Sequence, residues 1–241
     1  MTTHKSLVLH EYGKHPILQD SEKPVPKPGQ LLIKVEGSTI NPSDRLRLAG
    51  HYFPVPLPAT MGLEGTGRVV EANGEDIQTW VGKRVSFTQD GSGSWGEYAV
   101  TNPNTAFPID EDVPLHCAAS GIVNPLTVVG MTEIFNATPN KKGIIHTAAA
   151  SSLGRMLNKL CITLGIPLLN IVRREEHAVL LKSEGAQHVI VTQGDWQAQY
   201  TEAIKTHGFN VFFDALGGGP ITEALILGLN AGSYAHIYGY L

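Results

Sequence analysis

Residues 143–160, GIIHTAAASSLGRMLNKL, have the layout of a turn that binds the phosphates of a dinucleotide. A short apolar run leads into a turn of small residues, and a helical pattern follows. Turns of this kind usually carry three glycines: one permits the tight turn, one lets the backbone approach the pyrophosphate, and one lets helix and strand pack closely. Here Ala149, Ser151 and Gly154 occupy those positions, so only the packing glycine is present.

The serine in the middle position is compatible with two interpretations. The Ser151 hydroxyl could itself donate a hydrogen bond to a phosphate, with Ser152 and Leu153 beside it where the helix N-terminus faces the anion. The alternative is a buried junction of strand and helix in which the small residues serve packing alone. The turn by itself does not choose between them.

Two arginines further along the chain favour the phosphate-binding interpretation. About 20 residues after such a turn, a NAD-selective site carries Asp or Glu for the ribose hydroxyls. This chain instead has Arg173 and Arg174, in NIVRREE. Guanidinium groups suit a 2′-phosphate, which they bind through bidentate, charge-assisted hydrogen bonds. The plainer alternative is a solvated charge cluster that opens a helix, with Glu175 and Glu176 in its first turn. The position of the arginines predicts NADPH as the cofactor.

The elements that would hold these residues change in type along the chain. The first half contains short segments rich in β-branched residues and separated by turn residues, which predict a small β-barrel or a curled sheet: residues 6–13, 29–40, 65–73 and 83–88. The second half alternates strand-like and helical segments, which predicts a parallel sheet covered on both faces. We place the boundary near Ala119, with residues 121–135 as a helix that bridges the two domains.

Composition and charge exclude several classes of partner. The net charge is −4 and no Lys/Arg cluster is present, so a nucleic-acid partner is not expected. No apolar run is long enough to predict a membrane span. Cys117 and Cys161 lie far apart in apolar contexts, which favours core thiols over a disulfide framework. The N-terminus has no signal layout, so we expect a cytoplasmic protein, with mitochondrial import left open if the natural start lies upstream.

Several stretches in order along the chain together resemble the medium-chain dehydrogenase/reductase superfamily, in its zinc-free, quinone oxidoreductase-like branch. They are LHEYG, PGQLLIKVEGSTINPSD, GLEGTGRVVEAN, VGKRVSF, WGEYAV, NPLTVVGM, the small-residue turn and FDALGG. The resemblance covers essentially the whole chain. It implies an α/β protein with a GroES-like β-barrel domain over residues 1–118, a Rossmann domain over residues 119–241, and an active site in the cleft between them.

The residues at the family's metal positions predict that no metal is bound. Zinc-dependent members use Cys and His ligands, and the corresponding positions here are Asn41 and Leu63. Neither side chain suits Zn²⁺, which prefers thiolate, imidazole or carboxylate ligands. The cysteine-rich lobe that holds a structural zinc is missing as well, and the ten histidines show no ligand spacing.

Without zinc, the chemistry that the resemblance implies is hydride transfer from NADPH to a quinone or an α,β-unsaturated carbonyl. The resemblance also places Asn41 and Thr127 beside the nicotinamide ribose and Tyr52 near the substrate. A phenol there could donate a hydrogen bond or a proton to a developing enolate. The alternatives are a packing role for Tyr52 in a proline-rich loop and a turn role for Asn41 before Pro42.

Two acidic residues near these positions have more local expectations. Asp214 follows a predicted strand in FDALGG, where a helix N-cap is favoured over a place next to a ligand. Asp44 follows NPS, and we expect it to orient the loop that carries Asn41.

The chain ends at AHIYGYL, inside the fifth expected Rossmann strand, whereas family members continue and return to the first domain. We therefore expect a C-terminally truncated Rossmann domain. Three interpretations stay open: a fragment of a longer enzyme, a natural short form whose sheet edge pairs with another chain, as in a homodimer, or a fold with incomplete function. The functional alternatives are a 2-enoyl thioester reductase and a catalytically silent protein that binds NADPH.

Overall fold

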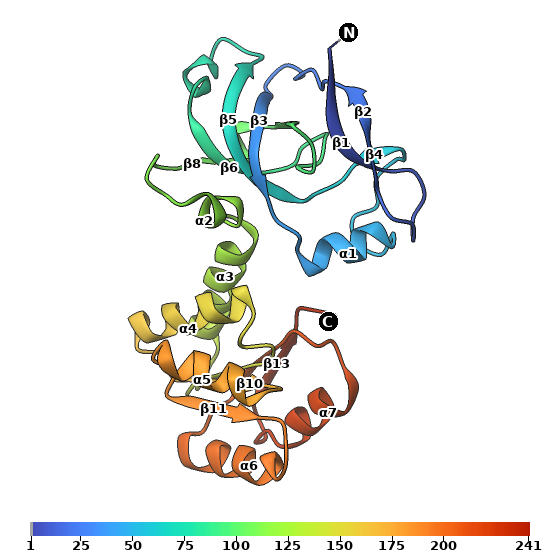
Figure 1. The fold of residues 1–241 in the computed structure, drawn as a ribbon. Coiled ribbons are helices and arrows are strands. Elements are labelled where there is room, and N and C mark those ends of the chain that lie inside the picture. Colours follow the sequence, from blue (N-terminus) through green and yellow to red (C-terminus); the bar gives the residue numbers. More distant parts are fainter. Residues whose placement is uncertain (1) are drawn as a thin grey trace. The chain divides into compact units, whose positions relative to one another are not determined.

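The structure is a computed structural model that describes residues 2–241, and the chain divides after Val123 into two compact units (Figure 1). The predicted boundary lay at residues 118 and 119. The α/β fold class is confirmed, since antiparallel sheets form the first unit and a parallel sheet with helices forms the second.

Two antiparallel sheets make up the first unit. The smaller has the strand order β2 (Ile17–Glu22), β1 (Thr3–Leu9), β4 (Ala59–Thr60). The larger has the order β7 (Tyr98–Thr101), β3 (Leu31–Ser38), β5 (Glu64–Ala72), β6 (Arg84–Thr88), β8 (Ala106–Pro108). Apolar side chains of the larger sheet form one buried cluster around Leu31, Ile33, Val85 and Phe87. The four strand segments expected in this half are β1, β3, β5 and β6, and the other four strands were not expected from the sequence.

Short helices connect these strands. They are α1 (Pro42–Leu48), the 3₁₀ turns η1 (Gln78–Trp80) and η2 (Pro103–Thr105), and α2 (Leu115–Ala119). Helix α1 was not predicted, although its start follows a simple rule: Pro42 occupies the first helical position, where the missing N–H costs nothing.

The second unit contains a five-stranded parallel sheet with the order β11 (His188–Val191), β10 (Leu168–Val172), β9 (Ile144–His146), β12 (Val211–Asp214), β13 (Tyr234–Ile237). Its helices are α3 (Val123–Ala137), which begins in the first unit, α4 (Ser152–Leu164), α5 (Glu175–Ser183), α6 (Trp196–His207) and α7 (Gly219–Leu227). This strand order, in which β9 is central and β10 and β12 lie on either side of it, is that of a Rossmann sheet.

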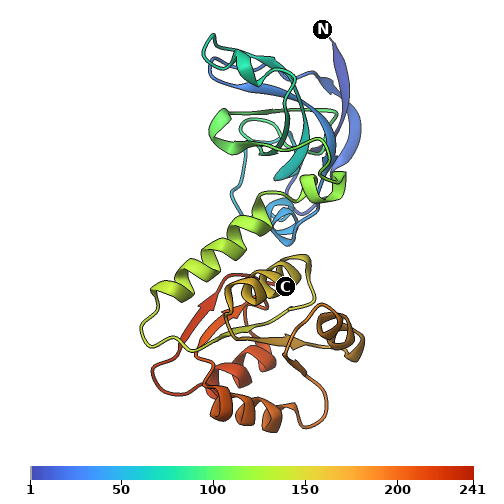
Figure 2. The ribbon, with the colours of Figure 1, turned by 90° about the vertical axis from the view of Figure 1, so that its left-hand side faces the viewer.

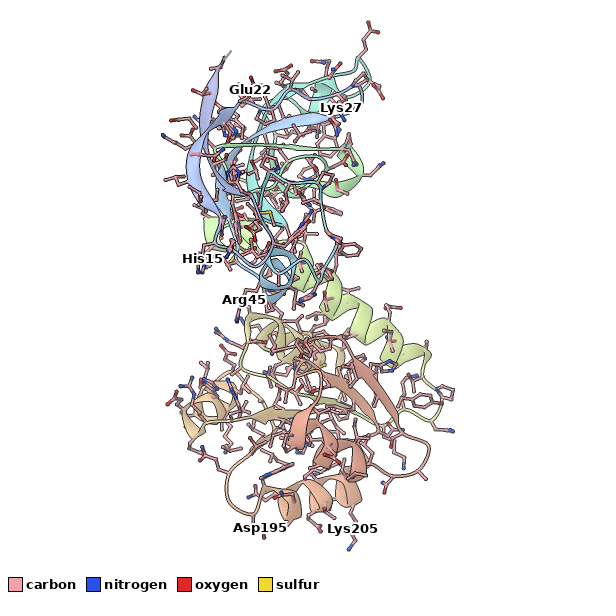
Figure 3. The ribbon with its side chains drawn as sticks, turned by 90° about the vertical axis from the view of Figure 1, so that its right-hand side faces the viewer. His15, Glu22, Lys27, Arg45, Asp195 and Lys205 are labelled. Atoms are coloured by element: carbon pink, nitrogen blue, oxygen red, sulfur yellow. The ribbon has the colours of Figure 1, made fainter. Side chains whose placement is uncertain are left out.

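Helices cover both faces of the parallel sheet, which explains why its strands are apolar throughout (Figure 2). Ile145 faces the layer of α6 and α7, where it packs with Trp196, Tyr200 and Leu225. Its neighbour Ile144 faces the other layer, with α3 and α4. The outer side of α6 carries the charge, and Figure 3 shows Asp195 and Lys205 directed away from the sheet.

The two cysteines differ in environment, which corrects one prediction. Cys161 lies in α4 and is buried, and this burial raises the pKa of its thiol to about 12. Cys117, in α2, is exposed rather than part of the core. The short helix α2 buries Ala118 and Ala119 and leaves Cys117 on its outer side. Within residues 2–241, no helix is both long enough and apolar enough to cross a bilayer.

Candidate functional site

The carboxyl edge of the parallel sheet brings together most of the residues that the sequence analysis selected. The chain leaves β9 toward β10 on one side, and β12 lies on the other side, so the order of strands reverses at β9. Ligands of open α/β sheets bind at the carboxyl ends of strands where this reversal occurs. The small-residue turn follows β9, the arginine pair follows β10, and Asp214 ends β12.

The turn after β9 is built without a glycine at its tightest point. Ala148 itself adopts a left-handed backbone conformation, with φ of 50°. The Ser151 N–H then donates to the Ala148 carbonyl oxygen at 2.9 Å, which closes the turn. Ser151 is the N-cap of α4, and its Oγ accepts a hydrogen bond from the Gly154 N–H at 3.1 Å. The hydroxyl is an acceptor in this bond, so its own hydrogen can still be donated to a ligand.

Gly154 is required by close packing. A Cβ at this position would collide with the carbonyl oxygen of Ala149, which is fully buried below the helix. The N-terminus of α4 faces outward above this contact. Ser151 and Ser152 are exposed and Leu153 is half-buried. Because the first turn of a helix has N–H groups without intrahelical acceptors, this end of α4 is suited to an anion.

The structure separates the two arginines that follow β10. Both are exposed. Arg174 is the N-cap residue of α5, and its guanidinium pairs with Glu176 at 3.0 Å and meets His177 Nε2 at 2.8 Å. The Arg173 guanidinium forms no hydrogen bond or ion pair with any residue from 2 to 241, although the Arg173 carbonyl accepts from Gln193 at 3.0 Å. Arg174 therefore has local partners, as the plainer interpretation expects, and the Arg173 guanidinium is unpaired within residues 2–241; the cofactor role of both stays a prediction.

Asp214 is fully buried, and the prediction that it is a helix N-cap is wrong. The N-cap of α7 is Gly218. Asp214 Oδ1 instead accepts from Thr147 Oγ1 at 2.6 Å, and its Oδ2 accepts from the Gly217 N–H at 2.9 Å and from Thr222 Oγ1 at 3.0 Å. The carboxylate ties β9, the turn after β12 and α7 together, and its contacts are all internal.

A buried histidine beside Asp214 was missed by the sequence analysis. His146 ends β9 and is fully buried, and its Nε2 lies 2.7 Å from the hydroxyl of Tyr238, just after β13. Burial lowers the pKa of His146 to about 4, against the opposing influence of Asp214. Burial also raises the pKa of Tyr238. Both side chains are therefore neutral near pH 7. Sequence alone gives no signal for this pair, whose members are distant along the chain.

In the first unit, Asn41 is held by two acidic residues. It precedes α1 and is 7% exposed. The Asn41 N–H donates to Asp44 Oδ2 at 2.7 Å, which is one half of a capping box, and Asp44 Oδ1 accepts from the Leu63 N–H at 3.0 Å. The expectation that Asp44 orients this loop is confirmed. Burial raises the pKa of Asp44. The Asn41 Nδ2 donates to Glu64 Oε1 at 2.9 Å.

Glu64 is a buried acidic residue beside Asn41 that was not expected from the sequence. It is buried, and it stands in the stretch GLEG, of which only Leu63 was considered as a metal position. The signal that could have revealed it is a single carboxylate between glycines at the start of a buried strand, because such a charge must find donors when it is buried.

Tyr52 and Thr127 lie in different surroundings. Tyr52 follows α1, is 38% exposed, and packs edge-on against Phe53 with ring centroids 4.5 Å apart. Phe53 is itself 69% exposed, so the Tyr52 ring belongs to no buried core. Thr127 is half-buried on α3. Asn41 and Tyr52 thus belong to the first unit, and Thr127 belongs to the second with the turn and the arginines. Their roles stay predictions.

Among the residues that the structure describes, no three His, Cys, Asp or Glu side chains are grouped so that they could hold a metal ion. The polar groups left available at the edge of the second unit are instead hydrogen-bond donors: the α4 N-terminus, the Ser151 hydroxyl and Arg173. Such a set binds phosphate groups.

The family described as alcohol dehydrogenase GroES-like domain matches residues 27–111. A mitochondrial enoyl-acyl-carrier-protein reductase of Caenorhabditis elegans is 31% identical over 198 residues, which cover 80% of this chain and 56% of the relative. The chain thus spans less than two thirds of the length of this curated relative.

Solved structures give longer matches. A proposed NADPH:quinone reductase of Mesorhizobium loti is 32% identical, with a TM-score of 0.91, and the match covers 100% of this chain and 76% of the relative. A proposed NADPH:quinone reductase of Bacillus thuringiensis is 27% identical, with a TM-score of 0.90, over 100% of this chain and 74% of the relative. The strand order and these relatives agree: the chain belongs to the medium-chain dehydrogenase/reductase superfamily, in the branch that contains quinone oxidoreductases and enoyl reductases.

Proposed function

We propose that this protein is an NADPH-dependent oxidoreductase that transfers hydride to a quinone or an α,β-unsaturated carbonyl without zinc. The observation that carries the proposal is the set of available donors at the carboxyl edge of the second unit. The exposed N-terminus of α4, capped by Ser151, follows β9, and the exposed Arg173 follows the neighbouring strand β10.

The donor set fits the phosphates of NADPH. The α4 N-terminus and the Ser151 hydroxyl would hold the pyrophosphate, and the close contact of Gly154 with Ala149 keeps that helix end against the strand. Arg173 would bind the 2′-phosphate, which distinguishes NADPH from NADH. Two solved relatives are described as NADPH:quinone reductases, which agrees with this assignment.

The bound cofactor would supply the hydride, and side chains of the first unit would act on the ligands. Asn41 is proposed to contact the nicotinamide ribose. The exposed Tyr52 is proposed to donate a hydrogen bond or a proton to the carbonyl oxygen of the acceptor, where negative charge develops. Thr127 is proposed to border the same ribose from α3.

A fluorescence titration of the 241-residue chain with NADPH, with NADH in parallel, tests the cofactor assignment. NADPH should bind at least roughly tenfold more tightly, because NADH lacks the phosphate that Arg173 would pair with. Equal affinity, or a preference for NADH, would remove NADPH from the proposal. A quinone and an enone are then tested as acceptors with the preferred cofactor.

The second candidate is a 2-enoyl thioester reductase, which is favoured by the match to the enoyl-acyl-carrier-protein reductase of C. elegans. A competition between a coenzyme A enoyl ester and a quinone separates the two candidates by which acceptor is reduced. A catalytically silent binding protein is the third candidate, and it predicts NADPH binding without turnover of either acceptor.

We propose that this protein resides in the cytoplasm. Cell fractionation tests this compartment against the mitochondria, which the name of the C. elegans relative indicates for that relative.

A further inference from the structure

A buried carboxylate in the first unit accepts four hydrogen bonds from two distant segments of the chain. Glu64, the first residue of β5, is 1% exposed. Its Oε1 accepts from Thr39 Oγ1 at 3.1 Å and from Asn41 Nδ2 at 2.9 Å. Its Oε2 accepts from the N–H groups of Ile122 at 3.3 Å and Val123 at 2.9 Å. Both oxygens are occupied, and no cationic side chain within residues 2–241 forms an ion pair with Glu64.

This carboxylate determines which end of the Asn41 amide is used inside the protein. A carboxylate accepts hydrogen bonds and does not donate them, so the Asn41 atom that faces it must be Nδ2. Thr39 gives the same answer, because its hydroxyl hydrogen goes to Glu64 and its Oγ1 accepts from Asn41 Nδ2 at 3.0 Å. The Asp44 N–H donates to the Asn41 main-chain carbonyl at 3.0 Å. The same Asp44 N–H also faces the Asn41 side chain in the capping box, and Oδ1 has two lone pairs, so it keeps acceptor capacity beside that contact.

We propose that Glu64 is a positioning residue that locks the Asn41 amide with Nδ2 inward, so that Asn41 meets the bound dinucleotide only as a hydrogen-bond acceptor. The inference rests on the proposed function for the identity of the ligand. It goes beyond that function because it assigns a polarity to Asn41 and a role to Glu64.

The polarity selects a part of the ligand. An amide oxygen binds groups that donate, such as the ribose hydroxyls and the carboxamide N–H of a nicotinamide nucleoside. Phosphates and quinone carbonyls are acceptors, and they would not bind to it. Asn41 therefore recognises the nicotinamide nucleoside and contributes nothing to the binding of the 2′-phosphate or of the acceptor carbonyl.

The substitution Glu64→Gln should invert this polarity. The backbone N–H groups of Ile122 and Val123 cannot turn over, so the glutamine oxygen must stay with them. The glutamine Nε2 then faces Asn41, and donor would oppose donor. Asn41 must lose this bond or rotate its amide, and rotation presents Nδ2 to the ligand in place of Oδ1.

The substitution Asn41→Asp fails for a different reason. It keeps an acceptor toward the ligand, but it sets a second carboxylate against Glu64 at hydrogen-bond distance, and like charges this close oppose each other. In the double variant the defects cancel, because the introduced glutamine can donate through its Nε2 to the introduced aspartate, whose other oxygen accepts from the ligand. Each single substitution should weaken binding, and the pair should restore it.

The test measures the affinity of four 241-residue chains for NADPH: wild type, Asn41→Asp, Glu64→Gln and the double variant. Each single variant should bind NADPH roughly tenfold more weakly, the effect of about one hydrogen bond, and the double variant should bind within about threefold of wild type. The control ligand is 2′,5′-ADP, which lacks the nicotinamide nucleoside and should bind all four chains alike.

The outcomes separate the inference from the proposed function. Wild type that binds neither NADPH nor 2′,5′-ADP overturns the proposed function, and the ligand assigned to Asn41 with it. Normal binding by wild type, with a double variant no better than the weaker single variant, overturns the positioning role of Glu64 alone. Parallel losses of NADPH and 2′,5′-ADP affinity in the single variants also overturn it, because they would indicate general damage to the fold.

Discussion

The carboxyl edge of the parallel sheet has a buried floor and an exposed rim, which use their polar groups in opposite ways. The floor consists of the buried residues His146, Thr147 and Asp214, and the hydroxyl of Tyr238, a residue that is 38% exposed, borders it through its bond to His146 Nε2. The polar side-chain atoms of the floor bond to one another, to nearby main chain or to a neighbouring hydroxyl, apart from His146 Nδ1, which has no partner within the described residues. The rim consists of Ser151, Ser152 and Arg173, all exposed.

This difference indicates which side chains can exchange their hydrogen bonds to water for hydrogen bonds to a ligand. The floor groups have lost their water, so each of their hydrogen bonds offsets a desolvation cost, and removal of one partner leaves another unsatisfied. The rim groups are hydrated in the free protein and can replace water by phosphate. Changes in the floor should therefore alter the free energy of unfolding, and changes in the rim should alter the affinity for NADPH.

The largest effect is expected for Asp214→Ala in the floor. The substitution removes the carboxylate that accepts hydrogen bonds from the hydroxyls of Thr147 and Thr222 and from the N–H of Gly217. We expect the free energy of unfolding to fall by about 3 kcal/mol, as measured by urea denaturation. Thr222→Val is the matched control, which removes one of these donors and should cost about 1 kcal/mol. If Asp214→Ala left the stability unchanged and bound NADPH roughly tenfold more weakly, Asp214 would act in ligand binding, as the rim residues are proposed to do.

A pH titration examines the floor without a mutation. The pKa of His146 is about 4 in the folded protein, against a reference value of 6.5. Between these pH values His146 is protonated in the unfolded chain and neutral in the folded protein. The free energy of unfolding therefore decreases as the pH falls from 6.5 toward 4. From about pH 7.5 to about pH 5 the loss attributable to His146 is about 2 kcal/mol.

His146→Gln isolates this contribution, because glutamine does not titrate and can still bond to Tyr238. Urea unfolding of both chains at about pH 7.5 and about pH 5 gives the comparison. The variant should lose less stability than wild type over this interval. Equal losses in the two chains would show that His146 titrates normally and that the floor is accessible to water.

The rim is tested by Arg173→Ala, with Arg174→Ala as its matched control. Removal of the Arg173 guanidinium should weaken NADPH binding by roughly tenfold and leave NADH binding unchanged, since a charge-assisted bond to phosphate is lost. Arg174 already pairs with Glu176 and His177, so its removal should change the NADPH affinity less than about threefold. Equal losses of NADPH affinity in the two variants would show that both arginines contribute equally to binding of the 2′-phosphate.

The fold and much of the rim were predictable from the sequence because they follow local patterns. Apolar strands such as β10 alternate with helices, and the small residues between β9 and α4 stand at fixed spacing. Arg173 could be selected because its distance from that turn has a chemical meaning. Its separation from Arg174 could not be predicted, because it depends on which neighbours the side chains of α5 offer.

The floor and the Glu64 cluster were not predictable because their members come from distant segments. His146 and Tyr238 are brought together only when β9 and β13 enter the same sheet on either side of β12. Asp214 was misassigned for the same reason: a local rule favours an N-cap, whereas its hydroxyl partner Thr147 comes from another strand's end. Buried carboxylates gather donors in three dimensions, and sequence spacing does not record them.

The smallest effect, and the finest test of floor against rim, is expected at Ser151, which contributes to both. Its Oγ caps α4 through the Gly154 N–H, and its hydrogen is available to a ligand. Ser151→Ala should lower the free energy of unfolding by about 1 kcal/mol and weaken NADPH binding roughly threefold. Ser151→Gly should recover most of the stability, since glycine is a tolerated N-cap, but not the affinity. Ser152→Ala, in the next position, controls for exposure alone. Recovery of affinity together with stability in Ser151→Gly would mean that the hydroxyl only caps the helix, and that the α4 N–H groups and Arg173 hold the phosphates without it.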